Sequence, residues 1–292
     1  MFYSAYGLTV QSDFELPELR SILSDGAADV DVISGEVPSK LPDARYLEPW
    51  ISISGRDVLY VIPGVVRLLV QDGSRVVVDL EDGARESDMR TYLIGSGLGT
   101  ILHQRALLPL HISAVLSPRG AIAFTGPPGV GKSTMAARIN AEIGWPIISD
   151  DVAVLDISDN KPKIESDIQR CRLWKDALDM LGIPTEGLTP DLHRTDKYAV
   201  LQPDMFVFGK QPLLALVELN STTGGAEMTP LRGLERCLTT IRAIYRPFLV
   251  RHLQDEAEIL KRISTASERI NVYRVGNPRQ TKIRDILNRV LS

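Results

Sequence analysis

The sequence predicts an α/β protein in which a smaller, β-rich N-terminal domain precedes a larger domain of strands and helices. Valine-rich runs bounded by turn dipeptides fill residues 58–80. From residue 110 onward, short apolar runs alternate with helical patterns, and one of these runs leads into a glycine-rich loop. Strands and helices that alternate in this way are typical of a sheet covered by helices.

The β-rich domain is assigned to residues 1–85. Its apolar runs at 58–62, 65–70 and 75–80 end at the turn dipeptides Pro63-Gly64, Asp72-Gly73 and Asp82-Gly83. Such dipeptides between valine-rich runs are hairpin signals, so we expect neighbouring antiparallel strands. The residues before 50 contain many prolines and aspartates, which favour loops between strands.

A helix is expected from about Ser87 to Arg105, and residues 86–106 are assigned as a connecting helix. Apolar side chains recur on one face at steps of three and four, at Met89, Leu93, Ile94, Leu98, Ile101 and Leu102. Glycines in a helix cost about 1 kcal/mol each relative to alanine. We therefore expect Gly95, Gly97 and Gly99 to allow close packing against a neighbouring element.

The larger domain is assigned to residues 107–292. Strands are expected at 110–115, 121–125, 146–149, 152–155, 213–219 and 270–275. Helices are expected at 132–143, 174–181, 232–245, 253–267 and from about 279 onward. Gly182 follows the second of these helices and is a typical helix end.

The composition is ordinary for a soluble protein, with 44% hydrophobic and 24% charged residues among 292. The 33 basic and 37 acidic residues give a net charge of −4, which offers no electrostatic case for nucleic acid or an anionic membrane. No apolar window approaches the roughly 18 residues of a spanning helix, and the first residues lack a secretion signal. Cys171 and Cys237 form no disulfide or zinc framework pattern. We therefore expect a cytoplasmic protein.

A phosphate-binding loop is predicted between the strand at 121–125 and the helix at 132–143. The pattern G-x-x-x-x-G-K-[ST] is matched by Gly126-Pro127-Pro128-Gly129-Val130-Gly131-Lys132-Ser133, and Thr134 follows. Glycines let backbone N–H groups point at phosphate, and the helix adds its positive N-terminal end. Lys132 is expected on the β and γ phosphates, and Ser133 on Mg²⁺. The expected cofactors are ATP and Mg²⁺.

Two adjacent carboxylates, Asp150 and Asp151, close the apolar run that begins at Pro146. Behind a phosphate-binding loop, an acid at a strand end reaches the metal, and a second acid can take a proton from a hydroxyl. Adjacent acids also repel, which raises one pKa. The alternative is a surface turn, which the upstream loop and the apolar strand disfavour.

The histidines and cysteines carry little signal by themselves. His111 lies in an apolar run shortly before the loop strand, where a histidine is most often a satisfied core or edge residue. His103, His193 and His252 are expected to be structural or exposed, and Cys171 and Cys237 to be packing residues.

The order of His111, the loop 126–133 and the pair Asp150-Asp151 resembles the catalytic domain of HPr kinase/phosphorylase. The resemblance covers about residues 107–156 well and the rest loosely. The segments Leu107-Leu108-Pro109-Leu110-His111 and Cys171-Arg172-Leu173-Trp174 look more like the related kinases of peptide-tailoring clusters. Those include enzymes that phosphorylate the C-terminal serine of lasso-peptide precursors. The resemblance implies a P-loop kinase domain of HPr-kinase type.

The resemblance also implies roles for the matching positions. Asp151 would deprotonate the acceptor serine, Asp150 would hold the metal with Ser133, and His111 would position the pair. Arg172 and Lys197 are candidates for contacting phosphate or the peptide, but neither matches a motif of its own. The chain departs from the family pattern at Thr134-Met135, where a glutamate usually follows the serine, and its glycine-rich arginine signature is replaced by a faint Gly209-Lys210.

Three functions follow from this sequence. The first is an ATP-dependent serine kinase whose partner is a peptide or small protein with an acceptor serine, such as the C-terminal serine of a ribosomal (lasso) precursor. The second is a bifunctional kinase and phosphorylase acting on a carrier protein, which the departures disfavour. The third is a nucleotide-sensing module without transfer activity. A homo-oligomer is compatible with each.

Overall fold

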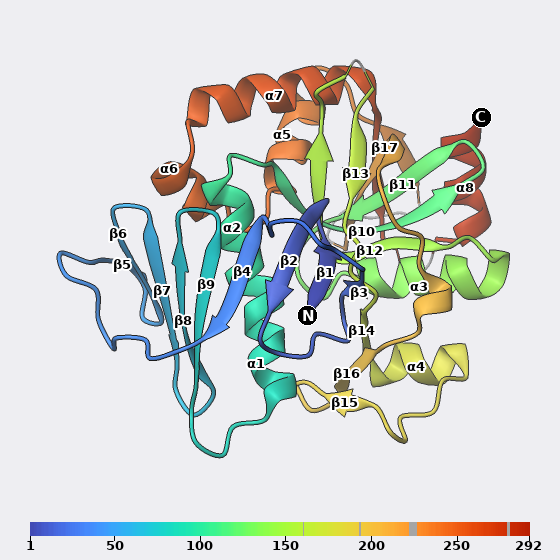
Figure 1. Ribbon diagram of the computed structural model, residues 1–292. Helices are drawn as coiled ribbons and strands as arrows, with labels where there is room; N and C mark the ends of the chain where they lie inside the picture. The colour runs from blue at the N-terminus through green and yellow to red at the C-terminus, as the bar shows by residue number, and fades with distance from the viewer. Residues whose placement is uncertain (160, 193, 222–226, 279–280) are drawn as a thin grey trace. The chain divides into compact units, whose positions relative to one another are not determined.

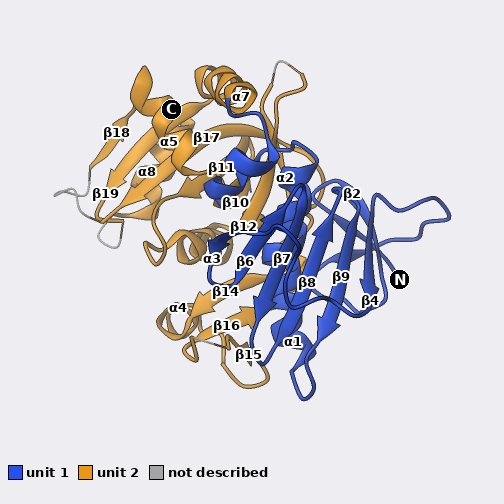
Figure 2. Ribbon diagram, turned by 90° about the vertical axis from the view of Figure 1, so that its left-hand side faces the viewer, with its two compact units in different colours: residues 1–109, 246–256 blue, residues 110–245, 257–292 orange. Residues whose placement is uncertain are grey.

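The computed structural model describes residues 1–159, 161–192, 194–221, 227–278 and 281–292. The chain divides into two units, which are coloured separately in Figure 2. Unit 1 contains residues 1–109 and 246–256, and unit 2 contains residues 110–245 and 257–292. Residues 86–106, expected as a connecting helix, fall inside unit 1. The return of residues 246–256 to unit 1 was not predicted from the sequence.

Unit 1 is built on a nine-stranded sheet in the order β3-β1-β2-β4-β9-β8-β7-β6-β5. The strands β5 to β9 form an antiparallel meander, whereas β4 pairs in parallel with β2 and β9. Figure 1 labels these strands, whose bounds are β1 Phe2–Ala5, β2 Leu8–Ser12, β3 Arg20–Ser21, β4 Val30–Ser34, β5 Arg45–Glu48, β6 Ile51–Ser54, β7 Asp57–Ile62, β8 Val66–Gln71 and β9 Arg75–Leu80.

The hairpin strands predicted from the valine-rich runs are confirmed as β7, β8 and β9. In the turn between β8 and β9, Asp72 and Gly73 both have positive φ, at 50° and 67°. The Ser74 N–H closes this turn on the Gln71 carbonyl at 3.0 Å. An Asp-Gly pair suits such a turn because both residues tolerate the left-handed region. The residues before 50, expected mainly as loops between strands, contribute five strands.

The helix predicted from about Ser87 to Arg105 is confirmed, but its middle is a π-helix instead of an α-helix. It consists of α1 Glu86–Tyr92, a π-helical segment Leu93–Leu98 and α2 Gly99–Gln104. All six apolar residues predicted on one face are buried. At Gly97, an added Cβ would lie 3.5 Å from Val76 and 3.8 Å from Leu68, so the segment packs on β8 and β9. Those distances are ordinary contacts, and alanine would fit there.

Buried hydrogen bonds fasten the end of this helix to the sheet of unit 1. The side-chain amide of Gln104 donates to the carbonyls of Arg56 at 2.6 Å and Val70 at 3.2 Å, and its oxygen accepts from the Gly73 N–H at 2.8 Å. The hydroxyls of Tyr60 and Thr100 lie 2.6 Å apart. Buried polar groups that are satisfied in this way add to stability instead of costing desolvation energy.

The returning segment of unit 1, with the 3₁₀ turn Pro247–Leu249 and α6 Val250–Leu253, is held by a cation–aromatic stack. The Arg246 guanidinium lies 5.3 Å from the ring centroid of Trp50 and 5.8 Å from that of Tyr60. It also donates to the Ser96 hydroxyl at 2.8 Å. Arg246 has a φ of 47°, a strained value for a residue with a side chain, so these contacts must outweigh that strain.

Unit 2 contains a seven-stranded sheet in the order β11-β10-β12-β13-β17-β19-β18, and β11 also pairs with β17. Five of the strands thus close into a ring, from which β19 and β18 extend. The pairings β11–β17 and β17–β19 are parallel. The strand bounds are β10 Pro109–Ser117, β11 Gly120–Thr125, β12 Ile147–Asp156, β13 Lys163–Glu165, β17 Gln211–Asn220, β18 Met228–Pro230 and β19 Asn271–Gly276.

A second, three-stranded sheet in unit 2 has the order β14-β16-β15. Its strands are β14 Cys171–Trp174, β15 Thr189–Pro190 and β16 Lys197–Val200. The helices of unit 2 are α3 Lys132–Ile143, α4 Lys175–Leu181, the 3₁₀ turn Pro203–Met205, α5 Leu234–Arg242, α7 Glu256–Arg269 and α8 Ile283–Leu291. The helices predicted at 132–143 and 174–181 are confirmed, and Gly182 ends α4 with a φ of 67°.

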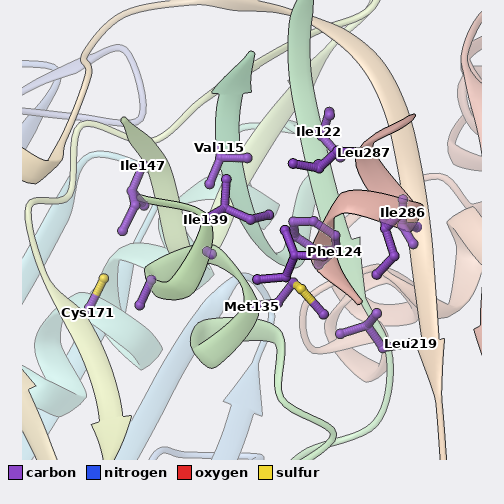
Figure 3. Close-up of a cluster of buried hydrophobic side chains, with 14 of the residues drawn as sticks. Val115, Ile122, Phe124, Met135, Ile139, Ile147, Cys171, Leu219, Ile286 and Leu287 are labelled. Carbon is purple, nitrogen blue, oxygen red and sulfur yellow. The ribbon is translucent and has the colours of Figure 1, made fainter. Parts of the chain in front are cut away.

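One hydrophobic cluster of unit 2 joins both of its sheets to their helices (Figure 3). Phe124 on β11 is fully buried between α3, which contributes Met135 and Ile139, and α8, which contributes Ile286 and Leu287. Cys171 and Leu173 extend the cluster to the small sheet. The loop that follows Phe124 therefore stands on a packed base of apolar side chains.

The structure corrects one prediction that bears on the site. The separate strands expected at 146–149 and 152–155 are one strand, β12, so Asp150 and Asp151 lie within a strand and not at its end. The ladder hydrogen bonds of β12 to its neighbours outweigh the turn preference of two aspartates. The short strands β13 to β16 and β18 were not predicted, because two to four residues give only a weak period. Among the described residues, no helix has the length and apolarity needed to cross a bilayer.

The Arg246 stack leads to a stability prediction for unit 1. Replacing Arg246 with alanine removes two cation–aromatic contacts and one hydrogen bond, so we expect a loss of about 1–2 kcal/mol in unfolding free energy. The matched control is Arg251→Ala in the same segment, where the arginine side chain is 77% exposed and, among the residues that the structure describes, pairs with Glu256 alone. Denaturant unfolding should show little change in this control, and equal effects of the two variants would contradict the stack.

Candidate nucleotide and acceptor site

The glycine-rich loop between β11 and α3 has the backbone that a phosphate-binding loop requires. Gly126, Gly129 and Gly131 all have positive φ, at 139°, 79° and 105°. At Gly126, a Cβ would lie 2.4 Å from the carbonyl oxygen of Leu219 on β17, so only glycine fits there. This close approach is set by the parallel pairing of β11 with β17. The loop is therefore fixed in place by the sheet beneath it.

The side chain of Lys132 lies back across this loop. Its ammonium donates to the carbonyls of Gly126 at 3.0 Å and Pro127 at 3.4 Å, and the residue is buried. Desolvation lowers the pKa of Lys132, against the opposing charges of Asp151 and Asp150. The group remains a cation near neutral pH, held where the loop N–H groups and the start of α3 converge.

The loop opens on a cavity of about 1110 Å³ in unit 2. Seven of the residues predicted to contact the nucleotide line this cavity, namely Pro128, Gly129, Val130, Gly131, Lys132, Ser133 and Thr134. Gly126 and Pro127 are not among the lining residues, since Gly126 packs against β17 and Pro127 offers its carbonyl to Lys132. The remaining polar lining includes His111, Asp150, Asp151, Arg172, Arg194 and Lys197.

The two aspartates of β12 differ in their surroundings. Asp150 is buried and accepts two hydrogen bonds, from the Ser113 hydroxyl on β10 at 2.7 Å and from the Arg172 backbone N–H on β14 at 2.7 Å. The side chain of Asp151 is 34% exposed and faces the His111 Nε2 at 3.5 Å. One carboxylate is thus fixed by the framework, whereas the other is accessible from the cavity.

His111 is oriented from two sides. Its ring meets that of Tyr245 edge to face at a centroid distance of 6.1 Å, and its backbone N–H donates to the Ala243 carbonyl at 2.6 Å. Burial lowers the pKa of His111 below 6.5, although the Asp151 carboxylate acts in the opposite direction. The imidazole is therefore neutral near pH 7, and a neutral ring can donate one hydrogen bond to Asp151.

The electrostatics of Asp151 favour its ionised form. Burial alone would raise its pKa, but the charges of His111, Arg172 and Arg170 outweigh burial and lower the pKa below 3.8. The sequence argument that two adjacent acids raise one pKa is therefore wrong for Asp151, because positive side chains dominate around it. An ionised carboxylate at neutral pH is ready to accept a proton or to bind a cation.

Sequence reasoning gave no role to a group of basic side chains that accompanies the aspartates. Arg170 is buried, and Arg172 and Lys197 stand on the small sheet, where Arg172 pairs with Asp191. The alternation Cys171-Arg172-Leu173-Trp174 was the available signal, since it places Arg172 and Trp174 on the face opposite the buried Cys171 and Leu173. Cys171 and Cys237 are free thiols, and burial raises the pKa of Cys171 well above 9.0.

The remaining predicted residues lie outside the cavity lining. Lys210 forms an ion pair with Asp156 at 2.6 Å, which lowers the pKa of Asp156 to about 2, and the Gly209 N–H donates to Asp167. His103 is fully buried in unit 1, with its Nδ1 2.8 Å from the Gln254 amide. His193 lies outside the described residues. Among the residues that are described, no group of three or more His, Cys, Asp and Glu side chains forms a metal site on its own.

A second group of charged side chains stabilises β17, the strand that pairs with β11 beside the loop. Glu218 on β17 stands opposite Thr125 of β11, and it accepts hydrogen bonds from Arg242 at 2.9 Å and from Arg274 at 2.6 Å. Glu218 is 9% exposed and does not line the cavity. Its two arginine partners satisfy the buried carboxylate, so its role is to hold β17, β19 and α5 together.

The close approach at Gly126 is testable. The substitution Gly126→Ala adds a Cβ against the Leu219 carbonyl at a φ that side chains disfavour, so unit 2 should lose about 1–3 kcal/mol of stability or more. The control is Gly129→Ala, which has a positive φ but no atom within 4 Å of the added carbon. Thermal unfolding should rank Gly126→Ala as clearly worse, and a reversed order would contradict the geometry.

The opposite charges of Asp151 and Lys132 near His111 predict opposite titration shifts. The Asp151 carboxylate raises the pKa of His111 and the Lys132 ammonium lowers it. Asp151→Asn should therefore move the NMR titration midpoint of His111 further below 6.5, and Lys132→Met should move it upward. Because the folded pKa is lowered, this histidine costs stability as pH falls through 6.5. Shifts in the same direction would disprove this arrangement.

No model of a known protein family and no curated protein matches the chain. Among solved structures, the chain is similar to the Hpr(Ser) kinase/phosphatase from Coxiella burnetii, with 11% sequence identity and a TM-score of 0.34. The match covers 63% of this chain and 87% of that one. A likeness at this score carries no weight for fold or activity, which rest on the geometry of the chain itself.

Proposed function

We propose that the protein is an ATP-dependent kinase that phosphorylates a serine hydroxyl. The observation that carries this proposal is the ionised Asp151 carboxylate, which lines the same cavity as Lys132 and Ser133 of the phosphate-binding loop. A triphosphate seated on the loop would direct its terminal phosphate into this cavity. A hydroxyl entering the cavity would then find a proton acceptor and a phosphoryl donor together.

In the proposed reaction, the serine oxygen attacks the γ-phosphorus of ATP in line with the bridging oxygen to the β-phosphate. The new O–P bond forms as the bond to the bridging oxygen breaks, and ADP leaves. The hydroxyl proton passes to the Asp151 carboxylate. Lys132 and the N–H groups of the loop stabilise the negative charge on the phosphoryl oxygens, so positioning and electrostatics supply most of the rate.

Mg²⁺ would fit this site. The metal usually binds one or two carboxylates together with substrate phosphates and water, and Ser133, Asp150 and Asp151 all line the cavity. Each oxygen of Asp150 accepts one hydrogen bond and retains a second lone pair. Ser133 and Asp150 would hold the ion, which would offset charge on the phosphates. Asp151, the more accessible of the pair, remains the base.

The proposed acceptor is a seryl residue of a peptide or small protein, with the C-terminal serine of a ribosomal (lasso) precursor as the leading candidate. This choice rests on the motif order around His111, the loop and the aspartate pair, and on the segment Cys171–Trp174. A cavity of about 1110 Å³ is large enough for a triphosphate beside a short peptide segment. A bifunctional carrier-protein kinase and phosphorylase would show itself by phosphate-dependent removal of phosphoserine.

The test of this function is the substitution Asp151→Asn. It keeps the shape of the side chain and removes the base, so phosphoryl transfer should fall by about 10²–10⁴-fold while Mg-ATP still binds. Intact-mass analysis of candidate precursor peptides measures transfer, and calorimetry measures binding. Lys132→Met should instead weaken Mg-ATP binding.

The matched control for this test is Asp179→Asn, on α4 at the cavity wall, where Asp179 pairs with Lys175. This variant should transfer phosphate at nearly the rate of the unaltered protein. If Asp151→Asn kept full transfer, Asp151 would not be the base. If Mg-ATP gave no heat of binding with the unaltered protein, the kinase proposal would fail, and if ATP bound but no peptide gained mass, the nucleotide-sensing module would be favoured.

A further inference from the structure

The small sheet of unit 2 presents two chemically different faces. In the antiparallel pairing of β14 with β16, Arg172 stands opposite Ala199 and Trp174 opposite Lys197. The alternate residues Cys171, Leu173 and Val200 are buried in the hydrophobic cluster, and Tyr198 packs against it. Arg172, Trp174 and Lys197 therefore share the other face, and all three line the cavity. We call these three residues the basic face.

Lys197 is the least compensated cation of the basic face. Its ammonium lies 5.9 Å from the ring centroid of Trp174 and forms no ion pair with any carboxylate among the described residues. Arg172, by contrast, is paired with Asp191. Burial and the neighbouring Arg172 charge both lower the pKa of Lys197. The charges of Asp150 and Asp151 act in the opposite direction but do not outweigh these two effects. A half-buried cation with no carboxylate in direct contact costs desolvation energy that a bound anion would offset.

The basic face lies close to the proposed base. The charges of Lys197 and Arg172 both act on Asp151, and the N–H of Arg172 is bound directly to Asp150. The phosphates of the nucleotide would bind the cations and N–H donors of the loop and of the start of α3. These elements are separate from the strands β14 and β16, which carry the basic face. An anion on the basic face would therefore be a part of the molecule whose hydroxyl reaches Asp151.

The charge of the lining indicates the kind of anion. Among the described residues, six basic and five acidic side chains line the cavity, and Lys132 among the basic ones belongs to the phosphate loop. Without Lys132, five basic and five acidic side chains remain and balance, so the lining opposes a doubly charged phosphate more than a single carboxylate. Trp174, at 39% exposure, adds an apolar surface beside the cation.

We infer that the basic face binds a carboxylate of the acceptor, carried by the residue that bears the hydroxyl or by its neighbour. This inference rests on the proposed kinase function for the identity of the acceptor. The carboxylate could be the C-terminal group of a peptide or an acidic side chain next to the serine. Both present the same oxygens to Lys197, and the experiment below separates them.

The experiment measures binding of short peptides to the full chain loaded with magnesium and a non-hydrolysable ATP analogue. The probes are acetyl-Gly-Gly-Ser with a free carboxylate, the same peptide as its amide, acetyl-Gly-Asp-Ser amide, and inorganic phosphate. We expect at least one of the two carboxylate peptides to bind about tenfold more tightly than acetyl-Gly-Gly-Ser amide, by calorimetry. Tight binding of the free acid alone identifies a C-terminal carboxylate, and tight binding of the aspartyl amide identifies a side chain.

Substitutions at Lys197 test whether the basic face is responsible. Lys197→Gln should abolish the preference for the carboxylate, and Lys197→Arg should keep it and show that the site still folds. The matched control is Lys163→Gln, because Lys163 pairs with Asp159 at 2.5 Å and does not line the cavity. A preference that survives Lys197→Gln would overturn the inference, as would equal binding of acid and amide peptides.

The binding measurement is separate from the test of the kinase function. Phosphoryl transfer to acid and amide peptides at equal rates would support a kinase and overturn the carboxylate inference. A Lys197-dependent preference without any transfer would support the inference and count against the kinase. If inorganic phosphate bound in a Lys197-dependent manner and neither carboxylate peptide did, the basic face would be a phosphate site and the inference would be wrong.

Discussion

The arrangement of the site depends on one buried carboxylate. Asp150 accepts a hydrogen bond from Ser113 on β10 and another from the backbone of Arg172 on β14, and it belongs to β12 itself. It thereby ties the closed ring of strands to the small sheet. A buried charge with two donors is far more stable than one left unpaired, so these three strands are held in a fixed relation. The same hydrogen bonds also help to fix the positions of Asp151, which is next in the chain, and of the basic face, to which Arg172 belongs.

The phosphate loop depends on a different kind of constraint, which is steric. Gly126 has no room for a side chain beneath it because the β17 backbone runs directly alongside in parallel with β11. Behind it, Phe124 and the residues of α3 and α8 fill the base. One part of the cavity lining is therefore set by backbone packing and another part by hydrogen bonding to a carboxylate.

Some of this arrangement could be predicted from the sequence and some could not. The loop, Lys132 and helix α3 have local signals, since glycine spacing and a helical period lie within a few neighbouring residues. The hairpin strands β7 to β9 were predicted because valine runs and Asp-Gly turns are likewise local. The strand β12 was wrongly divided at its aspartates, since pairing with β10 and β13 decides its length. Arg172 and Lys197 were only candidate contacts in the sequence, and their common face with Trp174 was not predicted, because Trp174 and Lys197 meet through a pairing across 23 positions of sequence.

The return of residues 246–256 to unit 1 has a consequence for how the chain can be cut. Unit 2 is not one continuous stretch of the chain, since its last 36 residues come after the segment 246–256, which belongs to unit 1. A fragment that stops at residue 109 would lack Arg246 and its cation–aromatic contacts with Trp50 and Tyr60. The same arrangement means that a protease nick between residues 245 and 257 would cut a segment of unit 1 and separate the two stretches of unit 2 along the chain. Neither unit can be exchanged through one junction, because the chain passes between the units after residues 109, 245 and 256.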